Sequence, residues 1–199
     1  MLVVTGPSGV GKGTLIRSLM ERLPGLALSV SATTRAPRPG EVHGRDYWFL
    51  SPEEFDERLR AGDFLEHATY AGNRYGTLRS EVERAATCPG ASAEAVGGPA
   101  GTVLEIEVEG ARQVRAAMPE AVRVFVAPPS LEALRSRLVG RGSDQPPQIE
   151  DRLAVAEREL AARDEFRHVV VNDRLEEAVD ELATLVARVW DRPTRGAAP

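Results

Sequence analysis

The sequence predicts an α/β fold in which a central parallel sheet is flanked by helices. Four short runs rich in β-branched residues cover residues 2–5, 102–108, 122–127 and 168–171. Three of these runs are almost wholly apolar, as strands buried on both faces must be. Segments with the apolar spacing of amphipathic helices lie between them, and this alternation is typical of α/β layers with right-handed crossovers.

The helical pattern predicts helices, in chain order, at residues 14–23, 51–61, 110–118, 130–139, 151–163 and 175–190. The best-marked start is Ser51, because Glu54 three residues later completes a capping box and Pro52 occupies the first helical position. The stretch 26–78 interrupts the alternation by mixing strand-like pieces at 47–50 and 64–70 with turns. We interpret this stretch as a small inserted lobe.

Size and charge limit the class of protein. The 199 residues suit one domain with small appended lobes. A formal net charge of -5 argues against a nucleic-acid or membrane-surface binder, since such proteins usually carry a basic excess. No apolar stretch approaches the roughly 18 residues of a membrane span, and the N-terminus lacks the pattern of a signal peptide. We therefore expect a cytoplasmic protein without nucleic-acid or membrane partners.

Two segments lack the apolar groups that a fixed conformation needs. Residues 85–101, which include the single cysteine, are mostly small, so we expect a flexible loop there. We also expect a disordered tail at 192–199.

The strongest local signal is a phosphate-binding loop, the P-loop, that directly follows the first strand. It comprises Gly6, Pro7, Ser8, Gly9, Val10, Gly11, Lys12, Gly13 and Thr14. Glycines let successive backbone N–H groups curl around a phosphate, the next helix adds its N-terminal dipole, and the lysine reaches the β and γ phosphates of ATP. Gly13 stands where Ser or Thr usually contacts magnesium, so Thr14 is the candidate Mg²⁺ ligand, directly or through water.

The identity of the basic residues supports the P-loop independently. Of the 25 basic residues, 24 are arginines and the one lysine is Lys12. A compact ammonium fits between phosphate oxygens, whereas a broad planar guanidinium does not, so lysine chemistry is needed at this position. The alternative is a glycine-rich turn of purely structural role.

Two pairs of charged residues are separate candidates for polar sites. Arg35 and Arg38 lie three residues apart in a proline-stiffened loop, which suits phosphate binding, although an exposed polar loop explains that segment equally well. Glu105 and Glu107 lie two apart on the predicted strand 102–108 and so share a face. Because burying unpaired carboxylates is costly, we expect both at the carboxyl end of the sheet; the alternative is an exposed edge strand.

With the segments 31–44, 46–47, 64–68 and 72–77 added to the P-loop, the chain closely resembles the guanylate kinases, as far as about Asp173. The resemblance implies a P-loop kinase fold: a central parallel sheet flanked by helices, a small inserted mixed α/β lobe that binds the nucleoside monophosphate, and a helical lid. It implies a core with the P-loop at 1–30 and 78–136, a GMP-binding lobe at 31–77, a lid at 137–160 and further core at 161–191.

The resemblance also implies the reaction, which is transfer of the γ-phosphoryl group of Mg-ATP to GMP in purine nucleotide metabolism, giving ADP and GDP. It implies that the GMP phosphate is held by Arg35, Arg38, Tyr47 and Tyr75, and that guanine is read by Ser31, Glu66, Thr77 and Glu105. A carboxylate suits guanine because it accepts from both N1–H and N2–H, an edge that adenine lacks.

For the ATP side, the resemblance implies that positive charge on the migrating phosphoryl group is supplied by Lys12, Arg137, Arg141 and Arg152. Asn172 matches a family segment near the adenine. Glu107 stands where many guanylate kinases carry Asp and would contact magnesium-bound water.

Two other functions stay open at this point. Another kinase of the same fold could act on a different monophosphate or a non-nucleotide acceptor, which comparing turnover of GMP, AMP, CMP and UMP would detect. A non-catalytic guanylate-kinase-like module could bind phosphorylated peptides, but such modules typically lack the P-loop glycines and lysine that this chain retains.

Overall fold

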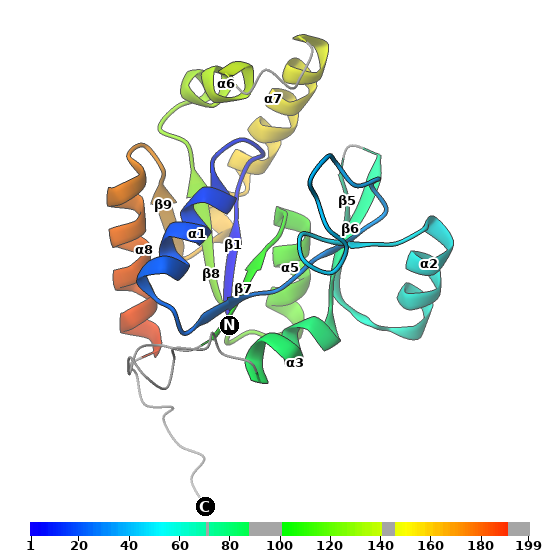
Figure 1. The fold of residues 1–199 in the computed structure, drawn as a ribbon. Helices are drawn as coiled ribbons and strands as arrows, with labels where there is room; N and C mark the ends of the chain where they lie inside the picture. Colours follow the sequence, from blue (N-terminus) through cyan, green and yellow to red (C-terminus); the bar gives the residue numbers. More distant parts are fainter. Residues whose placement is uncertain (71, 88–100, 141–145, 191–199) are drawn as a thin grey trace, which may run out of the picture.

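The computed structural model describes residues 1–70, 72–87, 101–140 and 146–190 (Figure 1). Arg141, most of the expected loop at 85–101 and the expected tail at 192–199 lie outside the described residues.

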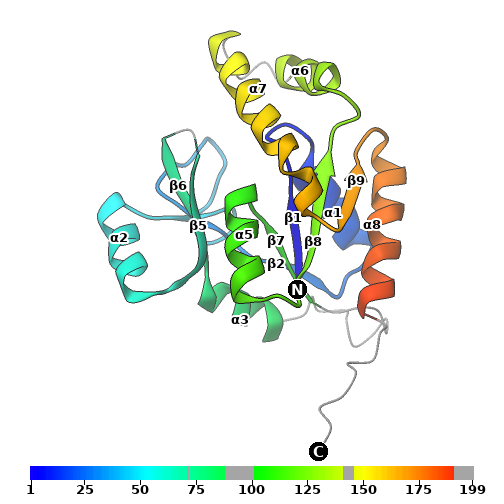
Figure 2. The ribbon, with the colours of Figure 1, turned by 180° about the vertical axis from the view of Figure 1, so that it is seen from behind.

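The central sheet is parallel throughout, with the strand order β2-β7-β1-β8-β9. Its strands are, in chain order, Leu2–Thr5 (β1), Leu26–Leu28 (β2), Gly101–Glu105 (β7), Val122–Ala127 (β8) and His168–Val171 (β9). Helices cover both faces of the sheet, as the two opposite views show (Figures 1 and 2). The predicted α/β class is therefore confirmed.

Alternation along β1 builds a separate core on each face of the sheet. Leu2 and Val4 lie in the core that contains buried residues of α1 (Lys12–Arg22) and α8 (Leu175–Trp190). Val3 lies in the opposite core, with buried residues of α5 (Val108–Ala117). All three side chains are fully buried, so β1 has no polar face, and its continuous apolar run follows from this position.

The inserted lobe forms its own sheet, in the order β4-β3-β6-β5. Its elements are Ala32–Thr33 (β3), Trp48–Phe49 (β4), Pro52–Ala61 (α2), Phe64–Tyr70 (β5) and Asn73–Leu78 (β6). Phe55 stacks on Phe64 with a centroid distance of 4.4 Å, in a small core shared with Ala32 and Leu78. Strand β5 also packs against α5, which joins the lobe to the rest of the molecule.

The remaining helices lie around the loop end of the sheet and beneath the lobe (Figures 1 and 2). They are Arg79–Thr87 (α3), Leu131–Gly140 (α6), Pro146–Ala161 (α7) and the short 3-10 helix Arg163–Glu165. Helix α3 was not predicted, so residues 85–87 are helical instead of part of a loop. Helix α7 begins at Pro146, five residues before the predicted start, because proline is tolerated in a first helical turn.

The strand predicted at 102–108 is shorter than the polar alternation suggested. Strand β7 ends at Glu105, and Glu107 is the N-cap of α5. The two acids therefore do not share the face of one strand, and that part of the prediction is wrong. Their spacing of two also suits the end of a strand followed by the start of a helix.

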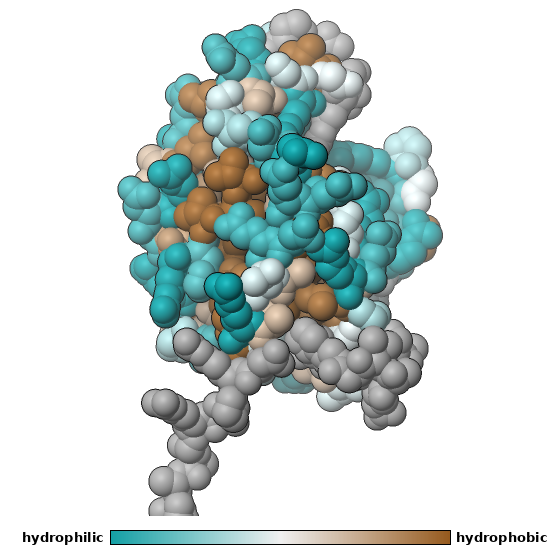
Figure 3. Space-filling view, turned by 90° about the vertical axis from the view of Figure 1, so that its left-hand side faces the viewer, coloured by the Kyte–Doolittle hydropathy of each residue, from teal (hydrophilic) through white to brown (hydrophobic). Residues whose placement is uncertain are grey.

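Charged and polar side chains predominate on the face that carries α8 (Figure 3). The apolar side of this helix, with Ala178, Val179, Leu182 and Val186, is buried in the core. Within the described ranges, no helix has both the length and the apolar character needed to cross a membrane.

The capping box at α2 is formed as predicted and can be tested by mutation. The Ser51 hydroxyl accepts from Glu54 N at 3.1 Å, and Ser51 N donates to Glu54 Oε2 at 2.7 Å. We expect Ser51→Ala to lower the free energy of unfolding by about 1 kcal/mol, measured by urea denaturation. The control Ser136→Ala, at an exposed position inside α6, should cause no such loss. Equal losses in both variants would contradict a capping role.

Candidate functional site

A cavity of about 440 Å³ lies where the carboxyl ends of β1 and β7 face the inserted lobe. This is the edge at which parallel α/β sheets bind ligands. Its lining brings together residues that the sequence placed in separate motifs: Pro7, Ser8, Gly9, Gly11, Lys12, Gly13, Thr14, Ser31, Arg38, Tyr47, Glu66, Tyr75, Glu105, Glu107 and Arg152. Of the predicted site residues that the structure describes, Gly6, Val10, Arg35, Thr77, Arg137 and Asn172 do not line this cavity.

The P-loop glycines are required by backbone conformation and by close neighbours. Gly6, Gly9 and Gly11 have φ values of 144°, 89° and 98°, which disfavour residues with a side chain. A Cβ at Gly6 would overlap the carbonyl oxygen of Val126 on the neighbouring strand β8. A Cβ at Gly11 would lie 2.7 Å from Asn172 Nδ2. The loop therefore packs directly on the sheet, with its curved backbone available to a phosphate.

The Lys12 ammonium lies inside the curve of the P-loop. Its side chain is only 8% exposed, and Nζ donates to Gly6 O at 2.5 Å and to Pro7 O at 3.4 Å. Glu107 Oε1 lies 3.9 Å from Nζ. A bound phosphate would give this desolvated charge a stronger partner than the two carbonyls do.

Asn172 and Arg137 support the P-loop from outside the cavity. The Asn172 amide donates to Val10 O at 2.8 Å, and Arg137 Nη1 donates to the same oxygen at 3.3 Å. Arg137 Nη2 also donates to Asn172 O at 2.8 Å. These bonds connect α6, the end of β9 and the P-loop. The expected contact of Asn172 with adenine stays a prediction, and its observed contact is structural.

Three acidic side chains surround Lys12. Burial raises the pKa of Glu105, and burial together with the neighbouring Glu107 raises the pKa of Glu159, on α7, to about 8. Glu107 Oε2 and Glu159 Oε2 are both buried, and the hydrogen bond that contributes to the raised pKa of Glu159 joins these two carboxyl groups.

The donor atoms fit a magnesium ion that is bound together with a nucleotide. Glu107 has a buried carboxyl oxygen beside the carboxyl of Glu159, Thr14 has a hydroxyl, and Glu107 and Thr14 both line the cavity. Among the described residues, no three His, Cys, Asp or Glu side chains are grouped to hold a metal by themselves. Mg²⁺ is commonly bound by one or two carboxylates, water and substrate phosphates, so this donor set is sufficient.

Glu66 forms the polar end of the cavity in the lobe. It is 4% exposed, and its Oε1 accepts from the Thr77 hydroxyl at 2.7 Å. Burial raises the pKa of Glu66 to about 7, against the opposing effect of the hydrogen bonds from Thr77. Thr77 thus does not line the cavity itself but holds Glu66, which does.

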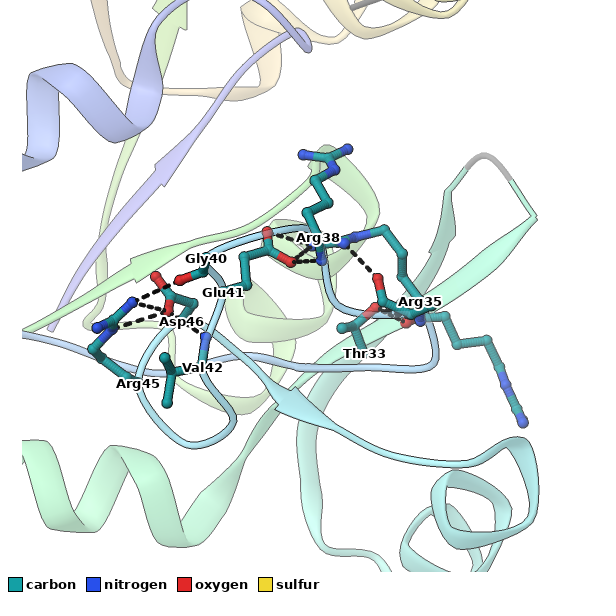
Figure 4. A network of polar contacts seen from close by, with 10 residues as sticks. Thr33, Arg35, Arg38, Gly40, Glu41, Val42, Arg45 and Asp46 are labelled. Carbon is teal, nitrogen blue, oxygen red and sulfur yellow. Dashed lines mark hydrogen bonds and ion pairs between the residues drawn. The ribbon is translucent and has the colours of Figure 1, made fainter.

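The predicted phosphate-binding arginines of the lobe are arranged differently from each other. Arg35 Nη2 donates to both oxygens of Glu41, at 2.8 and 2.9 Å, and Glu41 Oε2 also accepts from Arg38 N at 2.7 Å (Figure 4). The Arg38 side chain extends away from this pair, and it lines the cavity. Tyr47 and Tyr75, whose ring centroids lie 6.2 Å apart, also line the cavity. Arg35 would have to break its hydrogen bonds to Glu41 before it could bind a ligand phosphate.

Eight residues of the cavity lining were not predicted as site residues, and Arg17, Ser29 and Tyr70 are among those with polar side chains. Arg17 comes from α1, Tyr70 from the end of β5 and Ser29 from the segment after β2. Ser29 Oγ is buried without a hydrogen-bond partner among the described residues. A sequence signal existed for Arg17, which lies one to two turns into the helix that the P-loop opens, but Tyr70 and Ser29 carry no local motif.

The chain is similar to known proteins over nearly its whole length. A family model described as guanylate kinase matches residues 1–189. The chain is 51% identical over 189 residues to the guanylate kinase of Rubrobacter xylanophilus, covering 95% of this chain and 94% of that one. It is 52% identical over 198 residues to that of Gloeobacter violaceus, covering 98% and 91%. The crystal structure of guanylate kinase from Anaplasma phagocytophilum superposes with a TM-score of 0.75 at 31% identity, covering 100% and 89%.

The support that Asn172 gives to the P-loop predicts a measurable loss. We expect Asn172→Ala to lower the free energy of unfolding by about 1–2 kcal/mol, since a buried hydrogen bond to Val10 O is removed, and to weaken ATP binding. Urea denaturation and calorimetric titration measure the two effects. Asp173→Ala is the matched control, because that side chain is exposed and only its carbonyl contacts Arg137. The supporting role is wrong if both variants bind ATP like the parent.

Proposed function

The chain belongs to the guanylate kinase family and is an ATP-dependent nucleoside monophosphate kinase, and from this premise we propose how its residues transfer the γ-phosphoryl group of ATP to GMP. The observation that carries the proposal is the shared cavity. One end presents the Lys12 ammonium within the P-loop, and the other presents the buried Glu66 carboxyl. Two nucleotides bound at these ends would meet with their phosphates between them.

On the ATP side, the P-loop backbone binds the phosphates and Lys12 neutralises the migrating group. Phosphoryl transfer needs alignment and charge neutralisation more than covalent help from the protein. The attacking nucleophile is an oxygen of the GMP phosphate, so no nucleophilic side chain is required. Support comes from the burial of Lys12 and from its neutral carbonyl partners, which a phosphate can replace.

On the GMP side, Glu66 and Ser31 read the guanine, with Thr77 holding Glu66 in place and Glu105 nearby. Arg38, Tyr47 and Tyr75 hold the phosphate, and Arg35 joins them by releasing Glu41. Support comes from the cavity lining and from the Thr77 hydrogen bond to Glu66. A carboxylate at this point favours guanine over adenine, because only guanine offers two adjacent N–H donors.

Guanylate kinases use ATP and generally need Mg²⁺, and we propose Thr14 and Glu107 as the residues that hold the ion here, directly or through water. When bound, the ion neutralises charge on the ATP phosphates. The position of the Glu107 carboxylate in the cavity, with Oε1 3.9 Å from Lys12 Nζ, supports this assignment.

The lid arginines complete the proposed site. Arg152 lines the cavity, and Arg137 lies beside the P-loop, where it would exchange its bond to Val10 O for a phosphate. Arg141 is assigned by resemblance alone. Closure over the substrates would exclude water, which otherwise competes as the acceptor. The cytoplasmic location and the absence of nucleic-acid and membrane partners stay predictions from the sequence.

Lys12→Ala tests the proposed transfer directly. We expect GDP formation to fall by about 10²–10³-fold in kcat, since a preorganised charge at the migrating phosphoryl group is lost. A coupled assay of ADP release with GMP as acceptor measures the effect. Arg60→Ala removes an exposed positive charge from α2 and should retain the parent rate. Unimpaired GDP formation by Lys12→Ala would remove the basis of the mechanism.

The raised pKa of Glu66 predicts that GMP binding depends on pH. Accepting both guanine donors requires the ionised carboxylate, and below its pKa of about 7 the free protein holds this group mostly protonated. GMP affinity should therefore rise roughly tenfold between pH 6 and pH 8, following the ionised fraction. Calorimetric titration measures this rise.

Glu66→Gln separates this effect from titration of the GMP phosphate. The variant keeps the shape of the side chain but cannot ionise, so its pH dependence should retain only the contribution of the phosphate. An unchanged pH profile in the variant would show that Glu66 does not titrate in this range.

A further inference from the structure

Helix α5 holds the backbone of β5 next to Glu66. The Gln113 side chain makes two hydrogen bonds to the residue that follows Glu66: its Oε1 accepts from His67 N at 3.0 Å, and its Nε2 donates to His67 O at 2.7 Å. An amide that pairs with both polar groups of one peptide residue fixes the strand as a neighbouring strand would. Gln113 thereby fixes the position of the β5 backbone relative to α5.

The same face of α5 leaves space for the Glu66 carboxyl. Gly110 lies one turn before Gln113, so both residues face β5. A Cβ at Gly110 would overlap Glu66 Oε2 and lie 2.9 Å from Glu66 Cδ. Gly110 is buried and has no positive φ, so backbone conformation does not demand glycine here. Alanine is intrinsically favoured inside helices, and the glycine is therefore explained by the carboxyl group that packs on it.

We propose that Gly110 and Gln113 are positioning residues that set the guanine specificity of this enzyme by placing Glu66, an inference that rests on the proposed role of Glu66 in reading guanine. The other side of the carboxyl is held by Thr77, which is itself buried. The Glu66 side chain lies between these supports. An added methyl group at position 110 meets the end of a side chain, so it displaces Glu66 rather than the helix.

The same helix begins at the catalytic end of the cavity. Glu107, its N-cap, lies beside Lys12, and Gly110 follows three residues later. One rigid element therefore sets both the acid near the phosphates and the acid near the guanine. The distance between the two ends of the cavity depends on this helix.

Gly110→Ala tests the placement. We expect the KM for GMP to rise by about 10- to 100-fold, as for loss of a charge-assisted hydrogen bond, with the KM for ATP within twofold of the parent. In a Glu66→Ala background the same substitution should change the KM for GMP less than twofold, because the overlapping group is gone. An unchanged KM for GMP in Gly110→Ala, or an equal rise in both backgrounds, overturns the inference.

Recovery of folded protein gives a second measurement. If Gly110→Ala does not fold but Glu66→Ala/Gly110→Ala does, the overlap lies at Glu66 and the inference is supported. If the double variant also fails to fold, the overlap lies elsewhere and the inference is wrong.

Gln113→Met tests the other support with little change in side-chain length. It loses both hydrogen bonds to His67, so the KM for GMP should rise several-fold and the preference for GMP over AMP should fall. Arg115→Met, at an exposed position of the same helix, should leave both values unchanged. No change in Gln113→Met counts against the inference. If Glu66→Ala itself leaves GMP binding intact, the proposed reading of guanine is wrong. If Glu66→Ala weakens GMP binding strongly but Gly110→Ala leaves the KM for GMP unchanged, only the role of α5 is wrong.

Discussion

Burial of β1 on both faces is the constraint from which the site is built. Leu2, Val3 and Val4 have no contact with solvent, so the strand cannot shift relative to the two cores that it separates. The P-loop leaves the end of this strand, and the missing side chain of Gly6 lets it turn against β8. A loop fixed to a fully buried strand can present its backbone N–H groups to a phosphate without first having to be ordered.

In and beside the cavity, the buried Lys12 ammonium lies among partly buried acids. Lys12 lies near Glu107, while Glu105 and Glu159 have raised pKa values because burial disfavours their charged forms. Such groups are expensive to bury unless ligands later satisfy them. Arg35 shows the same principle in the lobe, because both oxygens of Glu41 accept from its Nη2. In the free protein, Lys12 and Arg35 thus each lie near an internal carboxylate.

Much of the fold follows from local patterns. Strands β1, β8 and β9 and helix α8 have the bounds that apolar periodicity predicts, and the start of α2 follows from its capping box. Helix α3 escaped prediction because its buried face includes Glu81, which weakens the apolar pattern. The predicted strand 102–108 extends beyond the end of β7 at Glu105. The alternation of Glu105 and Glu107 continues the period of a strand, although the backbone has already turned toward helix α5.

The P-loop and the doubly buried strands were determined by sequence alone, because consecutive residues carry all of their chemistry. The resemblance of the lobe motifs to one enzyme family also needed no coordinates. Tertiary packing alone brought together partners that are far apart in the chain: Gln113 with His67, 46 residues away, and Asn172 with Val10, 162 residues away. No local pattern encodes such contacts, since each depends on how separate elements pack around the two cores.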